Sequence, residues 1–371
     1  MAIAVPTTDL YIHLPFCVRK CDYCAFLSIP GADRTLRGRF LDRLEAELEA
    51  IAPRCAPLET IYLGGGTPTH FAPGELARLM SDIDRHFELA PDCEFTCEGN
   101  PVSLTRDKIT ILQEGGVNRF SIGIQSFSRE TRDAIGRDGD NDRVYTAFDN
   151  LRDSGVRSIN CDIIYGVTGQ TLAACESDIR EIARMQPDHV SAYTLMIEPG
   201  TTLSDQGVIE RDDDEIVAMW TLIGDVLDAE CGMTRYEISN HAGPGHRCEH
   251  NYRIWKGRRF LGAGPSACWF DDDGRWQNAR DLDAWFKHEP PSLDALSAEA
   301  RAAEILAMGL RTIDGWRRDE FQDITGYDFL ELRTPKIEAL TADGLLAFDD
   351  DCLHATQRGL LFANHIGREL L

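Results

Sequence analysis

Short apolar runs alternate with amphipathic stretches along the first half of the chain. Runs rich in β-branched and aromatic residues predict six strands, at 10–14, 60–63, 94–97, 119–124, 158–164 and 189–197. Between them, apolar residues recur at helical spacing over 40–51, 76–87 and 179–185. Repeated strand–helix alternation predicts an α/β fold, with a parallel sheet covered by helices. Six such units favour a complete or partial barrel.

The last part of the chain has a different pattern. Pro290-Pro291-Ser-Leu293 follows an aromatic-rich stretch and predicts a linker. Beyond it we expect a helix over 298–310, another over 335–340, a hairpin over 345–353 and a final helix over 358–371. The chain is therefore expected to divide into a barrel, a connecting segment and a small helical or winged-helix-like domain. Their expected ranges are 1–240, 241–290 and 291–371.

Three cysteines lie within eight residues just after the first expected strand. They are Cys17, Cys21 and Cys24, and no fourth cysteine is nearby. A closed structural metal site needs four protein ligands. Three thiolates can hold a [4Fe–4S] cluster by three of its irons and leave the fourth iron open. The spacing favours such a reactive centre, and the alternative is a zinc site completed by His13 or by a distant residue.

Glycines and isolated polar residues fall at the ends of the other expected strands. They are Gly64-Gly65-Gly66-Thr67-Pro68, Glu98, Gln125, Asp162 and Tyr193-Thr194. Each has a structural explanation when taken alone, as a tight turn, a helix cap or a partner for an arginine. In a barrel of parallel strands the carboxyl ends meet at one rim, where active sites form. Their convergence with the three thiols therefore predicts a ligand-binding site at that rim.

Composition excludes several classes of function. The formal net charge of −24 opposes binding to a nucleic-acid backbone. No apolar run approaches the ~20 residues that cross a bilayer, and residues 1–10 lack the features of a signal peptide. We therefore expect a cytoplasmic protein without a transmembrane segment. In that setting most of the twelve cysteines are expected to be free and buried.

The motifs resemble those of the radical S-adenosylmethionine (SAM) superfamily. The spacing Cys17-x3-Cys21-x-Tyr23-Cys24 is the motif of that superfamily, and Gly64–Pro68 resembles its loop for the SAM amino group. Nearly the whole chain resembles the family of oxygen-independent coproporphyrinogen oxidases and HemW-type heme chaperones. The segments that carry this resemblance are Tyr11–Cys17, Gly64–Thr69, Ser121–Phe127, Asp162–Gly166, Ile197–Thr201, Tyr236–Asn240 and His250-Asn251.

The resemblance implies a partial (β/α)6 radical SAM barrel with a smaller domain at its end. It implies a [4Fe–4S] cluster on the three cysteines and reductive cleavage of SAM to methionine and a 5′-deoxyadenosyl radical, which requires an electron donor. Two sets of residues are implied to surround SAM. The positions around a cluster-bound SAM are matched by Tyr11, Gly65, Glu98 and Thr194. The positions of a second SAM are matched by Tyr23, Gly66, Thr67, Gln125, Arg137 and Asp162, with Phe26 beside them.

Three features favour the chaperone branch of this family. The oxidases carry a further cysteine where this chain has Phe26, and they have more than the sixteen residues that precede Cys17 here. The chaperones carry a His-Asn-x-x-Tyr-Trp segment associated with heme. In this chain it includes His250, Asn251 and Trp255, with Ile254 in place of the tyrosine.

We therefore expect a heme chaperone that binds heme through this segment and delivers it to a recipient hemoprotein. Two alternatives use the same scaffold. One is a radical SAM methyltransferase or cyclopropanase, and the other is an oxygen-independent coproporphyrinogen III dehydrogenase.

Overall fold

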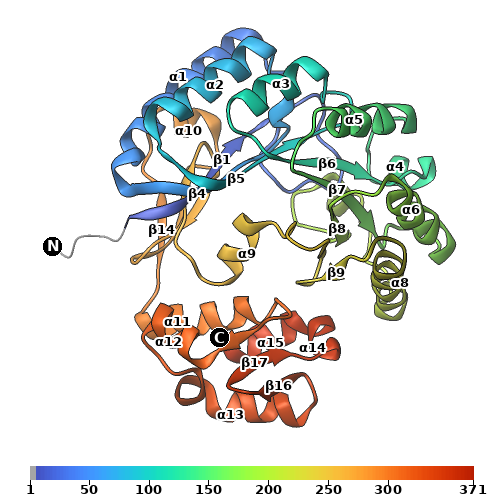
Figure 1. Ribbon diagram of the computed structural model, residues 1–371, viewed down its shortest axis with the longest axis vertical. Coiled ribbons are helices and arrows are strands. Elements are labelled where there is room, and N and C mark those ends of the chain that lie inside the picture. Colours follow the sequence, from blue (N-terminus) through green and yellow to red (C-terminus); the bar gives the residue numbers. More distant parts are fainter. Residues whose placement is uncertain (1–5) are drawn as a thin grey trace.

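A curved nine-stranded sheet forms the larger part of the molecule (Figure 1). The computed structural model describes residues 6–371, so residues 1–5 of the stretch considered for a signal peptide lie outside it. The strand order is β11-β1-β4-β5-β6-β7-β8-β10-β9. Pairing is parallel from β11 to β8 and antiparallel from β8 through β10 to β9. Since β11 and β9 are the two edges of the sheet, the barrel is partial, as expected.

All six expected strands are present. Together with three short strands they are Thr7–Leu14 (β1), Cys55–Gly65 (β4), Leu89–Gly99 (β5), Arg119–Gln125 (β6), Ser158–Tyr165 (β7), His189–Thr194 (β8), Thr234–Arg235 (β9), Asn240–Ala242 (β10) and Leu261–Ala263 (β11). The sixth expected strand ends at Thr194 rather than at residue 197, because the chain turns away toward Pro199-Gly200.

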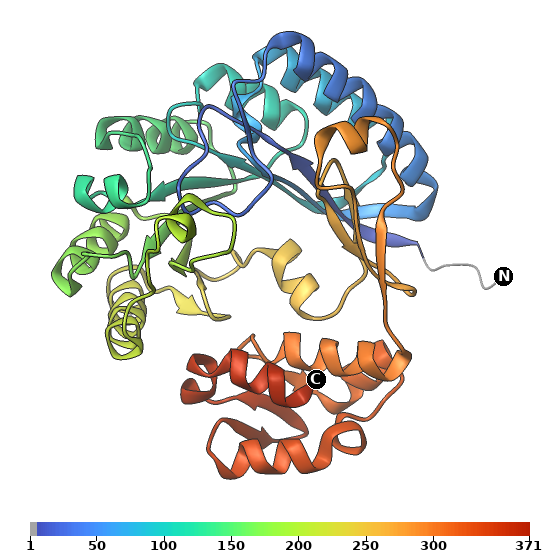
Figure 2. The ribbon, with the colours of Figure 1, turned by 180° about the vertical axis from the view of Figure 1, so that it is seen from behind.

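Helices cover the outer face of this sheet (Figure 2). They are Arg34–Ile51 (α1), Pro73–His86 (α2), Arg106–Glu114 (α3), Arg129–Ala134 (α4), Asn141–Asp153 (α5), Leu172–Met185 (α6) and Asp213–Cys231 (α8). The short helix Thr202–Asp205 (α7) lies instead beside Asp22, whose carbonyl accepts the Leu203 amide at 3.0 Å. Two 3-10 turns, Ala52–Arg54 and Pro68–His70, adjoin β4. The three helices expected from apolar spacing correspond to α1, α2 and α6, and each begins with a residue that favours a helix start, such as Asp33 before α1.

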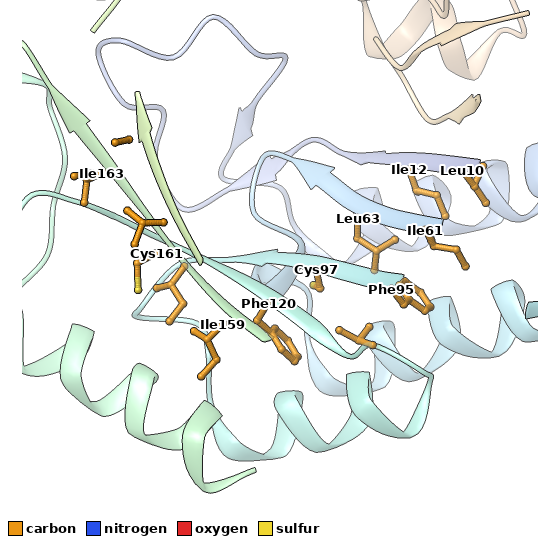
Figure 3. Close-up of a cluster of buried hydrophobic side chains, with 14 of the residues drawn as sticks. Leu10, Ile12, Ile61, Leu63, Phe95, Cys97, Phe120, Ile159, Cys161 and Ile163 are labelled. Carbon is orange, nitrogen blue, oxygen red and sulfur yellow. The ribbon is translucent and has the colours of Figure 1, made fainter. Parts of the chain in front are cut away.

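Side chains of the barrel strands alternate between an apolar and a polar environment. Figure 3 shows apolar side chains of five strands directed toward the helices: Leu10, Ile12, Ile61, Leu63, Phe95, Cys97, Phe120, Ile159, Cys161 and Ile163. Because successive residues of a strand point to opposite faces, the residues between them face the barrel interior. Those residues are mostly polar, and they include Glu98, Ser121, Asn160 and Asp162. The same alternation thus builds the core and the polar interior.

The segment after β10 continues the barrel rather than forming a separate region. β11 pairs with β1 in the main sheet, with Leu10 opposite Leu261. Helix α9 (Glu249–Trp255) lies inside the curve of the sheet (Figure 1). The remaining elements are α10 (Leu282–Phe286) and a sheet of Cys268–Phe270 (β12), Gly274–Gln277 (β13) and Ser292–Ala295 (β14).

The structure therefore differs from the expected divisions at 240 and 290. The first falls within β10. The second precedes β14, which occupies part of the expected linker and pairs with β13.

The chain ends in a small domain of helices around a three-stranded antiparallel sheet. Its elements are Ala298–Gly309 (α11), Trp316–Arg317 (β15), Arg318–Thr325 (α12), Phe329–Ala342 (α13), Leu346–Asp349 (β16), Cys352–Ala355 (β17), Gln357–Leu361 (α14) and Ala363–Leu370 (α15). The expected helix at 335–340 is part of the longer α13, which kinks at Arg333, two residues before Pro335. The expected final helix is divided in two at Phe362.

Candidate functional site

The cysteine loop lies beyond the carboxyl end of β1. Short strand β2 (Phe16–Cys17) pairs in parallel with β3 (Ile29–Pro30), so that residues 18–28 form a closed loop between them. The glycine turn after β4 is bonded to the start of this loop, since the Gly66 amide donates to the Leu14 carbonyl at 2.9 Å and the Thr67 amide to the Phe16 carbonyl at 2.9 Å. The two motifs are therefore held side by side.

Two of the three thiols have polar partners from other segments of the chain. Cys17, Cys21 and Cys24 are all free and half-buried. Thr67 Oγ1 lies 3.5 Å from Cys17 Sγ, and Arg137 Nη1 donates to Cys21 Sγ at 3.6 Å. The guanidinium places a positive charge beside the sulfur. The donor set therefore suits an anionic iron–sulfur cluster.

The zinc alternative does not fit the position of His13. Its Nδ1 bonds to the Tyr11 hydroxyl at 2.9 Å, and its Nε2 bonds to the Leu27 carbonyl at 3.0 Å. Both ring nitrogens are thus engaged away from the thiols. Across residues 6–371, no three His, Cys, Asp or Glu side chains converge where a single ion could be held.

Two glycines of the turn occupy positions that no other residue fits. Gly65 has a φ of +108°, and a Cβ there would lie 2.6 Å from the His13 ring. At Gly66 a Cβ would lie 2.7 Å from the Pro15 carbonyl carbon. The turn is therefore packed closely against His13 of β1 and against Pro15, which leads into the cysteine loop.

Two carboxylates face the interior near this turn. Glu98 accepts hydrogen bonds from the Tyr62 hydroxyl at 2.9 Å and from the Gly65 amide at 3.2 Å. Asp162 accepts from Ser121 and Asn160, each at 2.7 Å. Burial, reinforced by the charge of Asp162, raises the pKa of Glu98 to about 7. Burial also raises the pKa of Asp162. A cationic ligand would relieve this mutual repulsion.

A second group gathers near Cys21. Arg137 Nη2 donates to the Gly123 carbonyl at 2.6 Å. A Cβ on Gly123 would lie 2.9 Å from the Gln125 amide nitrogen and 3.1 Å from Arg137 Nη2, so both side chains lie over this glycine. Burial raises the pKa of Tyr23, and the nearby positive charge of Arg137 offsets part of this rise. The structure thus brings Tyr23, Gln125 and Arg137 together beside the cysteine loop.

Two of the expected SAM residues lie apart from these groups. The Thr194 side chain lies beside Tyr165, whose side chain packs in the main hydrophobic core. It therefore points away from the barrel interior. Phe26 lies in the cysteine loop and is 67% exposed.

The structure also places the expected heme residues away from the cysteine loop. His250 is 2% exposed, and its Nδ1 bonds to Thr60 Oγ1 at 2.7 Å. Its ring centroid lies 5.3 Å from that of Tyr62. Helix α9, which also carries Asn251 and Trp255, closes the interior at this level. The other ring nitrogen of His250, Nε2, is buried without a hydrogen-bond partner.

Comparison with known proteins identifies the family. Residues 11–182 match the Radical SAM superfamily, and residues 296–362 match the HemN C-terminal domain. The chain is 31% identical to "Heme chaperone HemW" of Bacillus subtilis (strain 168), over 96% of this chain and 97% of that one. It is 32% identical to the protein of that name from Mycobacterium tuberculosis (strain ATCC 25618 / H37Rv), over 98% and 94% of the two chains.

The chain belongs to the HemW family of radical SAM proteins. The corresponding protein of Escherichia coli (strain K12) is 30% identical over 98% of each chain. Membership implies a [4Fe–4S] cluster and SAM as cofactors. The solved structure of coproporphyrinogen III oxidase (HemN) from Escherichia coli has a TM-score of 0.85, at 22% identity, over 99% of this chain and 90% of that one. This likeness confirms the expected fold.

Two further facts bear on the organisation of this HemW-family chain. The HemN C-terminal match begins at residue 296, directly after β14 ends at Ala295. Among the helices of residues 6–371, none combines the length and the apolar character that crossing a bilayer requires.

Sequence reasoning missed several polar groups of the barrel interior. Tyr62 bonds to Glu98, and Asn160 bonds to Asp162 and to His189 Nδ1 at 2.7 Å. Arg119 also lies inside the barrel, where it is 3% exposed. The available signal was polar residues at every second position of otherwise apolar strands, as in Ser158-Ile-Asn160-Cys-Asp162.

Glu98 gives this HemW-family chain a measurable dependence of stability on pH. The pKa of Glu98 in the folded chain, about 7, lies above its ordinary value of 4.5. Between these values the folded chain holds a proton that the unfolded chain releases. The contribution of protonated Glu98 to the free energy of unfolding is fully present below pH ~4.5. It declines by up to about 1.4 kcal/mol per pH unit as pH rises toward 7. Glu98→Gln is therefore expected to gain stability relative to wild type from pH 5 to pH 8.

Urea unfolding at several pH values measures this difference in free energy. Glu114→Gln, at an exposed position on α3, is the matched control and should show no such trend. A difference between wild type and Glu98→Gln that stays constant with pH would show that Glu98 titrates normally.

Proposed function

We propose that this chain binds a [4Fe–4S] cluster through Cys17, Cys21 and Cys24, binds SAM beside it, and binds heme for delivery to hemoproteins. The observation that carries the proposal is similarity along the whole chain to proteins named heme chaperone HemW, over 96–98% of this chain and 94–98% of theirs. This similarity includes the small domain at the end. Phe26, where the oxidases are expected to carry a further cysteine, supports the same branch.

Each polar group at the barrel mouth has a role in this proposal. The cluster, when bound, supplies one-electron reduction of SAM. Glu98 and Asp162 accept hydrogen bonds from the hydroxyl or amine groups of SAM, and Gly65 allows SAM to approach the backbone. Arg137 donates to Cys21 Sγ and offers its guanidinium to a carboxylate. These residues hold and orient the ligand, whereas the radical chemistry belongs to the cofactors.

Heme binding through His250 requires a change in the position of α9. This helix is linked to the end domain, since Lys256 Nζ lies 2.9 Å from Glu320 and the Tyr252 hydroxyl donates to Asp314 at 2.9 Å. We infer that uncovering His250 involves loosening these contacts, whereas Asn251 and Trp255 are already partly exposed. The proposal includes two protein partners, a recipient hemoprotein and an electron donor.

A turnover assay separates the chaperone from an oxidase. Reduced, cluster-loaded protein supplied with SAM and coproporphyrinogen III is expected to form no decarboxylated porphyrinogen, because its role is to carry heme. Chromatography of the porphyrins and of 5′-deoxyadenosine measures both possible products. A known oxygen-independent coproporphyrinogen oxidase in the same mixture is the positive control. Decarboxylated product formed in proportion to 5′-deoxyadenosine would overturn the chaperone proposal.

A further inference from the structure

A cavity of about 410 Å³ opens at the amino-terminal end of the barrel. Residues from β4 and from the starts of β5, β6 and β7 line it, together with Gly245, His246, Arg247, Glu249 and Arg253. Arg119 begins β6 and Gln125 ends it, so at about 3.3 Å per residue the two lie ~20 Å apart along the strand. The cavity is therefore separate from the cysteine loop.

Arg119 is an unpaired charge in the wall of this cavity. Its side chain faces the barrel interior and is 3% exposed. Its Nε has no hydrogen-bond partner, and within residues 6–371 it forms no ion pair. A guanidinium stays protonated in proteins. The charge of nearby Glu94 favours the guanidinium but forms no ion pair with it, so the hydrogen-bonding capacity of Arg119 remains open to a ligand.

Glu94, the acidic residue near Arg119, already has hydrogen-bond partners of its own. The carboxylate of Glu94 accepts the backbone amides of Glu249 and His250, each at 3.0 Å, and so caps α9. Arg253, another residue of the wall, is paired with Asp9 and Glu59.

Arg157 remains as a second cation of the wall without an ion pair in the described chain. Asp92 and Glu249 also line the cavity. Their charges oppose a polyanion and favour a ligand with one small anionic group.

We propose that this cavity binds a small oxyanion, the carboxylate or phosphate group of a metabolite-sized molecule, through Arg119 and Arg157. The planar guanidinium of arginine binds both groups through two parallel hydrogen bonds. The volume lies in the range of small-molecule sites. The site does not depend on heme binding, because no group of the proposed heme or cluster site takes part.

Thermal unfolding with inorganic phosphate or malonate tests the proposal on the full chain. Both anions are expected to raise the melting temperature of wild type above that in chloride of equal ionic strength, because they bind the folded state. Arg119→Met should bind at least tenfold more weakly by calorimetry, yet be no less stable than wild type without ligand. Arg143→Met, at an exposed position on α5, should bind like wild type.

Equal stabilisation of wild type and Arg119→Met, or none of either, would overturn the site. A strongly destabilised Arg119→Met would also overturn it, since Arg119 would then be structural. Arg119→Lys keeps the charge and provides a second variant. This variant should fold. It should bind the anion at least fivefold more weakly, because lysine cannot form the two parallel hydrogen bonds of a guanidinium.

Competition identifies the source of the oxyanion. Displacement of malonate by hemin but not by hemin dimethyl ester would assign the site to the propionate groups of heme. Displacement by neither would assign it to a free small anion. Either result is consistent with an anion site in this cavity. If hemin binds without displacing malonate, the proposal that this chain binds heme at another site is unaffected.

Discussion

Replacing any one of Cys17, Cys21 or Cys24 by alanine is expected to abolish the cluster. A [4Fe–4S] cluster held by three thiolates has no spare protein ligand, so the loss of one leaves two, and two do not retain it. Wild type, reconstituted without oxygen, should contain about four irons per chain. Each variant should retain almost none. Iron and sulfide analysis together with the visible absorption spectrum measures the difference.

Cys55→Ala and Cys231→Ala are the matched controls for this experiment. Both residues are free, half-buried cysteines like the three of the loop, and both lie outside it. They should retain the iron content of wild type. Zinc without iron in the reconstituted wild type, or full iron content in Cys24→Ala, would contradict the proposed ligand set.

Gly65→Ala is expected to remove the effect of SAM on the reduced cluster. A Cβ at this position would lie 2.6 Å from the His13 ring, on a backbone whose φ of +108° only glycine adopts readily. The turn would shift, and with it the Gly65 amide that bonds to Glu98. In wild type, SAM should change the electron paramagnetic resonance spectrum of the reduced cluster by ligating its open iron. In the variant, SAM affinity should fall at least tenfold.

Gly74→Ala is the control for this change. Gly74 lies in the first turn of α2, and a Cβ there would meet nothing within 4 Å. Its spectrum should respond to SAM as wild type does. The variant Gly65→Ala must still hold about four irons for the comparison to count. An unchanged wild-type spectrum at saturating SAM would exclude ligation of the open iron.

The barrel could be predicted from the sequence because its strands and helices have strong local patterns. Strands such as Arg119–Gln125 carry β-branched or aromatic residues at every second position, and helices such as Pro73–His86 carry an apolar stripe. Motifs at strand ends then indicated the rim where Glu98 and the cysteine loop lie. Each of these signals is contained within a few neighbouring residues.

Features that depend on distant contacts could not be predicted in this way. The two prolines before β14 suggested a linker, and only the pairing of Ser292–Ala295 with β13 makes this segment a strand. His250 was expected to bind heme, but α9 places it against Thr60 and Tyr62 of β4. A local motif gives no information about which side chains cover it.

Titration of the protein with hemin, without oxygen, decides whether this chain binds heme. We expect a saturable spectrum of protein-ligated heme at one hemin per chain, with an affinity well above that for an unrelated acidic protein of similar isoelectric point. Binding no tighter than to that control, with no saturation near one hemin per chain, would contradict the assignment of this chain as a heme chaperone.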